Sequence, residues 1–177
     1  MTIRQKEGYD TFMTTIRIAT EVTKSLEEAY KVLIPQLSTS SNPPNDEQLQ
    51  NIIDSDSAQI LIAEDEHGEI LGTMTLIIFQ IPTGVRAWIE DVVVDTNARG
   101  AGIGEQLNLT AIDLAKQAGA KTVDLTSRPS RKAANQLYKN IGFVKRDTNG
   151  DTPVSAFNTN CKTSMCTCTE RLEIKSS

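Results

Sequence analysis

Residues 99–104 of the chain are Arg99-Gly100-Ala101-Gly102-Ile103-Gly104, and they lie between a β-type run at residues 89–94 and a helical pattern that begins near Glu105. Glycine lacks a Cβ, so it allows the backbone to approach a ligand closely and to adopt conformations that other residues avoid. A helix that begins directly after such a loop directs its unpaired N–H groups into it, and this arrangement binds anions. The order strand, glycine loop, helix therefore predicts a site for a pyrophosphate group.

Length, composition and charge describe a single globular domain. The chain has 177 residues, of which 38% are hydrophobic, and a net charge of −5; such values are typical of folded rather than disordered proteins. No apolar run reaches the roughly 20 residues that span a bilayer, and the first residues carry no signal-peptide core. We therefore expect a cytoplasmic location and no membrane partner. The acidic balance also disfavours nucleic acid, which binds basic surfaces.

The cysteines and the histidine disfavour two common kinds of site. Cys161, Cys166 and Cys168 have no fourth cysteine or nearby histidine to complete a structural zinc site, and the only histidine, His67, lies in a predicted turn. A Ser-His-Asp or Cys-His system requires a histidine that is available to the nucleophile. We therefore expect no metal and no nucleophile system of this kind.

Hydrophobic patterning predicts an α/β (α+β) fold, with a mixed sheet, helices on both faces and one parallel β-α-β unit around the glycine loop. We expect residues 1–13 to be a flexible N-terminal extension, and residues 14–177 to be one domain in which residues 148–169 form a long polar loop. Ser25, with Glu28 three residues later, is expected to cap the first helix. The predicted elements are a strand at 15–20, a helix from Ser25 to Pro35, a helix at 47–53, strands at 58–64, 70–80 and 86–95, a helix from Glu105 to Gly119, a strand at 122–126, a helix that ends at Gly142, and strands at 143–147 and 172–174.

Four roles are possible for the glycine loop. A Walker-A loop requires lysine after its last glycine, but Glu105 follows Gly104. A dinucleotide fingerprint requires glycine where Glu105 stands, and only one β-α-β unit is predicted, although Asp124 has the spacing of a ribose-binding acid. A glycine turn without a ligand stays open. The remaining pattern, [Q/R]-x-x-G-x-[G/A], is matched at every fixed position by Arg99, Gly102 and Gly104.

With this motif the chain resembles the GNAT superfamily of acetyl-CoA-dependent N-acetyltransferases. A second stretch, residues 133–143, matches the family signature A-x-x-[LF]-Y-x-x-x-G-F. The resemblance extends over residues 15–147, and it implies the GNAT fold, a twisted and mostly antiparallel mixed sheet with helices on both faces and one central β-α-β unit. Family members close with a hairpin soon after the Gly-Phe strand, whereas residues 148–169 intervene here.

The resemblance implies that acetyl-CoA is the cosubstrate, and it assigns residues to its binding. Backbone N–H groups of the glycine loop would hold the pyrophosphate. The main chain of the preceding strand would pair with the pantetheine arm, and one of its N–H groups would polarise the thioester carbonyl. The predicted cofactor-binding residues are Val92, Val93, Val94, Arg99, Gly100, Ala101, Gly102, Ile103, Gly104, Asn135 and Tyr138, of which Asn135 would hydrogen-bond either the pantetheine or the acceptor.

Acetyl transfer also requires an acid and a base. Tyr138 stands at the family's general-acid position. Glu90 is the predicted base, with Asp91 or a chain of waters as alternatives. With strict alternation along the strand, Glu90 would share a face with Trp88 and Val92, and Asp91 would lie on the opposite face, unless a bulge interrupts the strand.

These residues predict an N-acetyltransferase that moves an acetyl group from acetyl-CoA to a primary amine of a small molecule by direct attack, because no cysteine lies near the motif. Asp91 and Ser127 are predicted to contact the acceptor. The alternative is a catalytically idle acyl-CoA-binding, sensing or protein-interaction module of the same fold. Residues 72–76 and 89–92 resemble glucosamine-6-phosphate N-acetyltransferases, yet an amino acid, a polyamine or another small amine remains an equal alternative. A homodimer is also left open.

Overall fold

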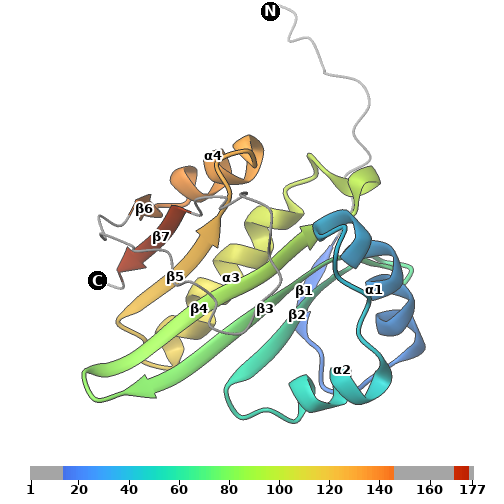
Figure 1. Ribbon diagram of the computed structural model, residues 1–177, viewed down its shortest axis with the longest axis horizontal. Helices are drawn as coiled ribbons and strands as arrows, with labels where there is room; N and C mark the ends of the chain where they lie inside the picture. Colours follow the sequence, from blue (N-terminus) through green and yellow to red (C-terminus); the bar gives the residue numbers. More distant parts are fainter. Residues whose placement is uncertain (1–13, 146–169, 176–177) are drawn as a thin grey trace, which may run out of the picture.

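A seven-stranded sheet in the order β1-β2-β3-β4-β5-β7-β6 forms the centre of the computed structural model, which describes residues 14–145 and 170–175 (Figure 1). Only β4 and β5 pair in parallel, and the other neighbouring strands are antiparallel. The elements are β1 (Thr15–Ile18), α1 (Lys24–Leu37), α2 (Asp46–Ile53), β2 (Ala58–Glu64), β3 (Ile70–Ile81), β4 (Gly84–Val94), the 3-10 turn η1 (Thr96–Ala98), α3 (Ile103–Gln117), β5 (Thr122–Ser127), α4 (Lys132–Asn140), β6 (Val144–Lys145) and β7 (Glu170–Lys175). The predicted fold class is confirmed. The predictions for residues 1–13, for the loop at 148–169 and for the three cysteines lie outside the described residues.

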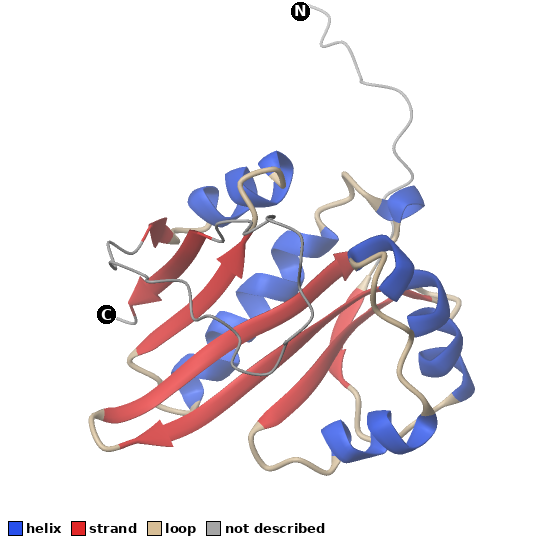
Figure 2. Cartoon of the chain, viewed as in Figure 1, coloured by secondary structure: helices blue, strands red, loops and turns tan. Residues whose placement is uncertain are grey.

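The helices cover both faces of the sheet (Figure 2). On one face, α3 packs on β3 and β4 in a cluster that includes Ile89, Leu107 and Tyr138. On the other face, α1 and α2 pack in a cluster that includes Leu33 and Leu49. Because α1 and α3 contact β3 and β4 from opposite sides, the two strands are covered on both faces where they pass between these helices, as expected for central strands. None of the helices within the described residues has the length and apolar run of a membrane span.

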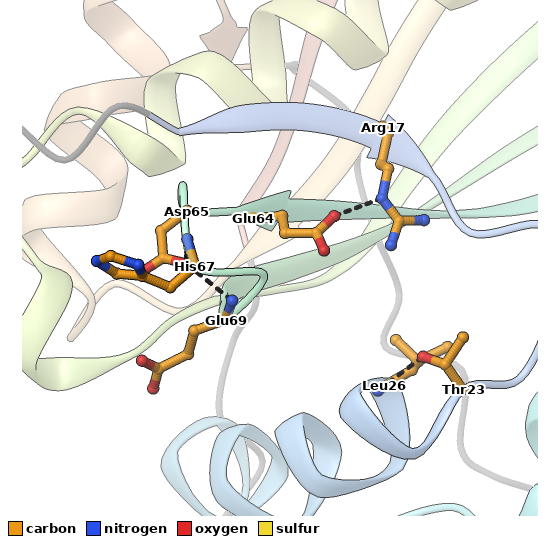
Figure 3. Close-up of polar contacts among 7 residues, drawn as sticks. All are labelled: Arg17, Thr23, Leu26, Glu64, Asp65, His67 and Glu69. Carbon is orange, nitrogen blue, oxygen red and sulfur yellow. Dashed lines mark hydrogen bonds and ion pairs between the residues drawn. The ribbon is translucent and has the colours of Figure 1, made fainter.

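The start of α1 differs from the prediction. Thr23, not Ser25, is the N-cap, and its side-chain oxygen accepts a hydrogen bond from the backbone N–H of Leu26 at 3.2 Å (Figure 3). Ser25 and Glu28 lie inside the helix, so the predicted capping box is wrong. Thr23 and Ser25 are both good capping residues, and the chain uses the one at which the backbone is still extended.

The predicted turn around His67 is confirmed. The Asp65 carboxylate accepts hydrogen bonds from the backbone N–H groups of His67 and Glu69, at 2.9 and 2.8 Å (Figure 3). Next to this turn, an ion pair between Arg17 and Glu64 joins β1 to β2. His67 is therefore part of an exposed hairpin turn.

A β-bulge interrupts β4 at Asp91. Glu90 lies opposite Thr75 and Val93 opposite Thr73, so two residues of β4 face one residue of β3. Asp91 has a φ of +51°, the only positive φ of a non-glycine residue within the described chain. The extra residue reverses the alternation: Ile89 packs with α3 before the bulge, Val92 does so after it, and Val93 belongs to the α1 cluster. The prediction that Glu90 shares a face with Val92 is therefore wrong, and the bulge is the reason.

The parallel pair of β4 and β5 is short. Its register runs from Ala87 opposite Val123 to Ile89 opposite Leu125, and β4 then continues to Val94 while β5 ends at Ser127. Beyond Ile89, the edge of β4 that faces β5 has no strand partner among the described residues. The two strands therefore separate, and the backbone of β4 on that side is left open to a ligand.

Candidate active site

A cavity of about 800 Å³ lies where β4 and β5 separate. Its walls come from the end of β4, the glycine loop, the first turn of α3 and the start of α4. The structure brings most of the predicted cofactor-binding residues into its lining: Val92, Val93, Val94, Arg99, Gly100, Gly102, Ile103, Gly104 and Tyr138. Ala101 and Asn135 are not in the lining, and Ala101 packs against the α3 cluster instead.

The glycine loop directs backbone donors into this cavity. Gly102 is the N-cap of α3 in a left-handed conformation, with φ +82° and ψ 0°. The first helical hydrogen bond runs from the N–H of Gln106 to the carbonyl of Gly102 at 3.0 Å. The N–H groups of Ile103, Gly104 and Glu105 therefore precede the helical ladder and have no helical carbonyl to bond. With the positive end of the helix dipole behind them, these N–H groups are suited to bind an anion.

Gln36, at the end of α1, holds the start of this loop. Its side-chain oxygen accepts from the N–H and the hydroxyl of Thr96, at 2.9 and 2.8 Å, and its amide nitrogen donates to the Asp95 carboxylate at 2.9 Å. The Gln36 hydrogen bond, and next the N–H of Asn97, lower the pKa of Asp95. Gln36 also lines the large cavity. Sequence reasoning missed it, because glutamine in a helix carries no local signal for a contact 60 residues away.

A second cavity, of about 340 Å³, adjoins the first. Its lining includes Glu90, Asp91 and Ser127, so the structure brings together the predicted base and both predicted acceptor residues. The two cavities share four lining residues, namely Leu37, Val92, Arg131 and Tyr138. A ligand in one cavity would therefore meet a ligand in the other beside Tyr138.

Tyr138 is buried at this junction, with 5% of its surface exposed. Its ring makes an edge contact with Phe143, with the ring centroids 5.9 Å apart. Burial raises the pKa of Tyr138, the charge of Arg131 opposes that rise, and the charge of Glu90 adds to it. The phenol consequently keeps its proton at neutral pH, as a general acid must.

Glu90 is half-buried on the second cavity. Its carboxylate accepts a short hydrogen bond of 2.5 Å from the indole N–H of Trp88, two residues earlier on the same face of β4. Burial raises the pKa of Glu90, the Trp88 hydrogen bond opposes the rise, and the negative charge of Asp91 adds to it. A carboxylate of raised basicity beside a cavity is suited to accept a proton.

Ser127 and Asn135 both carry a buried oxygen without a hydrogen-bond partner in the described part of the chain. Ser127 is among the residues that line the second cavity. The Asn135 amide donates to the carbonyl of Arg128 at 2.9 Å and thereby holds the loop between β5 and α4. The predicted contact of Asn135 with pantetheine or acceptor stays a prediction.

Asp124 and the potential metal ligands are the other polar groups that bear on the site. Asp124 is buried in β5, with its carboxylate 4.0 Å from the Arg86 guanidinium and 3.1 Å from the hydroxyl of Thr122. It is in the lining of neither cavity, so the ribose-binding interpretation finds no support. No group of three potential metal ligands lies together within residues 14–145 and 170–175.

Two curated proteins resemble part of this chain. A mycothiol acetyltransferase from Renibacterium salmoninarum is 35% identical over 94 residues, which are 52% of this chain and 28% of that protein. The "Probable glucosamine 6-phosphate N-acetyltransferase 2" of Oryza sativa subsp. japonica is 36% identical over 97 residues, which are 51% of this chain and 57% of that protein. The matches therefore span less than two thirds of the length of either relative.

Solved structures share this fold over most of the chain. A GCN5-related N-acetyltransferase from Kribbella flavida superposes with a TM-score of 0.70 at 18% identity, covering 92% of this chain and 98% of that one. Glucosamine-6-phosphate N-acetyltransferase from Arabidopsis thaliana gives a TM-score of 0.63 at 23% identity, covering 78% and 96%. At these identities the likeness shows the fold. The model of the acetyltransferase (GNAT) family matches residues 22–143, a range that contains the bulged strand, the glycine loop and Tyr138. The chain belongs to the GNAT family of acetyltransferases.

Proposed function

We propose that this protein transfers the acetyl group of acetyl-CoA to a primary amine of a small molecule by direct attack. The observation that carries the proposal is the meeting of the two cavities at Tyr138, one containing the anion-binding glycine loop and the other containing Glu90. GNAT acetyltransferases use acetyl-CoA, and the large cavity has the features that this cosubstrate needs. Direct attack requires donor and acceptor to be bound together, and two joined cavities allow that.

The donor would lie along the open edge of β4. Its pyrophosphate would accept hydrogen bonds from the N–H groups at the start of α3, and its pantetheine arm would pair with the backbone of residues 92–94, as an added strand does. This places the thioester near the junction of the cavities. An N–H group of β4 next to the bulge would then polarise the thioester carbonyl.

The residues at the junction would supply the proton transfers. Glu90 accepts a proton from the acceptor ammonium, directly or through water, and the free amine attacks the thioester carbon. The new C–N bond forms and the C–S bond breaks. Tyr138 protonates the leaving thiolate, and the second proton of the attacking nitrogen then returns to Tyr138, which leaves a neutral amide and a free thiol. The raised pKa of Glu90 suits its role, because the carboxylate gains basicity, and the Tyr138 phenol is protonated at neutral pH and so has a proton to give to the thiolate.

A thiol-release assay with acetyl-CoA and a panel of small amines tests the proposed activity. We expect free CoA to appear only when an amine is present, in amounts equal to the acetylated amine found by mass spectrometry. Binding of CoA is measured in parallel by calorimetry. Tight binding of CoA without turnover on any amine would instead identify an idle acyl-CoA-binding module.

The role of the glycine loop is tested by Gly102→Ala. A Cβ at this position meets no atom within 4 Å, so the fold has room for it, but the φ of +82° is strained for alanine by about 1–2 kcal/mol. We expect the loop to rearrange, so that N–H groups no longer point at the pyrophosphate and CoA binds about 10-fold more weakly.

Gly119→Ala is the matched control for this variant. Gly119 also has a positive φ, +76°, and no atom within 4 Å of an added Cβ, but it lies beyond the far end of α3 and outside both cavities. Both variants should lose similar stability in urea unfolding, and only Gly102→Ala should weaken CoA binding in calorimetry. Equal affinities of the two variants for CoA would contradict a role of the loop in binding.

A further inference from the structure

The smaller cavity has walls of opposite charge. Glu90 and Asp91 line it from β4, and Arg128 and Arg131 line it from the loop that follows β5. Because β4 and β5 separate after Ile89 and Leu125, the carboxylates of β4 and the two arginines of the loop after β5 come from the two sides of the opening. An acceptor in this cavity meets negative charge on one side and positive charge on the other.

Arg128 and Arg131 both have guanidinium N–H groups that make no hydrogen bond within the described residues. Arg128 is exposed, and no carboxylate within the described ranges lies within ion-pair distance of its side chain. The loop position of Arg128 is held through its carbonyl by Asn135, and the Arg128 guanidinium makes no hydrogen bond to another of the described residues. Arg131 donates from Nη2 to the carbonyl of Leu37 at 2.9 Å, and a guanidinium has five N–H donors. Neither charge is neutralised by an ion pair inside this part of the protein.

Ser127 supplies an independent indication of a ligand. It is 4% exposed, it lines this cavity directly before Arg128, and its hydroxyl has no partner among the described residues. A buried hydroxyl without a partner is costly, so a bound group that completes its hydrogen bond is expected. Next to two guanidinium groups, an anionic oxygen is the complementary group.

We propose that the acceptor is a small primary amine that also carries a carboxylate or a phosphate, bound by Arg128, Arg131 and the Ser127 hydroxyl while its amine faces Glu90. This inference rests on the proposed acetyl transfer and narrows its substrate class. A volume of about 340 Å³ lies at the lower end of the range for small-molecule sites, roughly 300–1,000 Å³. A polyamine fits poorly, because its second ammonium group would face the arginines.

Pairs of amines that differ in the anionic group test the proposal. We would compare kcat/KM for O-phosphoethanolamine with ethanolamine, and for β-alanine with propylamine. The anionic member of at least one pair is expected to be better by about 10- to 100-fold, the range for charge-assisted hydrogen bonds. The pair with the larger ratio identifies phosphate or carboxylate as the group that is bound.

Variants of Arg128 test whether this residue causes the preference for anionic amines. Arg128→Gln should reduce the preference by raising KM for the anionic amine several-fold more than for its neutral counterpart, and Arg128→Lys should restore part of it because the charge is retained. Lys139→Gln is the control, since it removes an exposed positive charge from α4 outside both cavities. Equal use of neutral and anionic amines by the unaltered protein, or an equal loss for both in Arg128→Gln, would overturn the proposal.

Calorimetry separates this inference from the proposed activity. O-phosphoethanolamine, β-alanine and their neutral counterparts are titrated into the CoA-saturated protein and into Arg128→Gln. Binding of an anionic amine that depends on Arg128, without any turnover, would support the site and refute acetyl transfer. Turnover without an anionic preference would support acetyl transfer and refute this inference. Neither turnover nor Arg128-dependent binding would refute both.

Discussion

Replacement of Tyr138 by phenylalanine is expected to lower kcat for acetyl transfer by about 10²- to 10⁴-fold, the usual contribution of a general acid. Without the phenol, the thiolate must leave unprotonated or take its proton from water. The aromatic ring is retained, so the edge contact with Phe143 and the packing in the α3 cluster should persist. Binding of CoA and resistance to urea should therefore change little. Single-turnover measurements of thiol release at saturating acetyl-CoA provide the test.

Tyr30→Phe is the matched control for this experiment. Tyr30 is also a buried tyrosine, 6% exposed, and burial raises its pKa to about 12, but it lies on α1 and lines neither cavity. Its hydroxyl bonds to Thr73, so its loss should cost roughly 1 kcal/mol of stability and leave kcat within a few-fold. If Tyr138→Phe were as active as Tyr30→Phe, the thiolate would obtain its proton elsewhere.

The sequence predicted the parts of this fold that are encoded over short distances. Alternating and helical hydrophobic patterns located the strands and helices, and the glycine motif placed a loop at the start of α3, where the structure has it. A helix or strand is specified by neighbours a few residues apart, so its pattern survives in the sequence. The glycine loop and Tyr138 could be named because their motifs, continuous in the sequence, resemble those of the GNAT family, and Glu90 because it is a carboxylate in the strand before the loop.

The features that the sequence did not predict depend on a choice between two equally suitable residues or on contacts between residues far apart in the chain. Thr23 and Ser25 have similar capping ability, and the tertiary fold decides between them. The bulge at Asp91 has no local signal, yet this single extra residue reverses which valines face α3. Gln36 and Arg131 form bonds to residues 60 and 94 positions away, and no periodic pattern encodes such partners. Sequence reasoning therefore found the proposed reacting residues more readily than the residues that hold them.

Replacement of Glu90 by glutamine is expected to reduce kcat/KM at neutral pH by about 10²- to 10⁴-fold and to change its pH dependence. Only the ionised carboxylate accepts a proton, so the rate of the unaltered protein should rise with pH through the raised pKa of Glu90. Glutamine does not titrate in this range. The plot of rate against pH for the variant should therefore lack this rise on the acidic side, called the acidic limb below. Initial rates from pH 4.5 to 9 on a single acceptor measure the effect. A limb that persists in Glu90→Gln would assign the base to another group, with Asp91 the nearest candidate.

The same pKa shift predicts the opposite effect on stability. The folded protein holds the Glu90 proton more tightly than the unfolded chain does, so this group stabilises the fold below its unfolded pKa, near 4.5, and that stability is lost as pH rises through the raised folded pKa. Glu90→Gln should therefore resist urea better than the unaltered protein at neutral pH, and this advantage should shrink near pH 4. A gain in stability together with a loss of activity is characteristic of a strained catalytic residue and not of a structural one.

Trp88→Phe is expected to change the pKa of the Glu90 carboxylate while the carboxylate itself stays in place. The indole N–H donates to the Glu90 carboxylate and opposes the rise of its pKa, and phenylalanine has no such donor. We expect the acidic limb of the rate profile to move to higher pH in this variant, because the carboxylate becomes more basic. At pH values above the limb, activity should approach that of the unaltered protein, since the base itself is intact. A limb at the same pH in both proteins would show that the titrating group is not the carboxylate bound by Trp88.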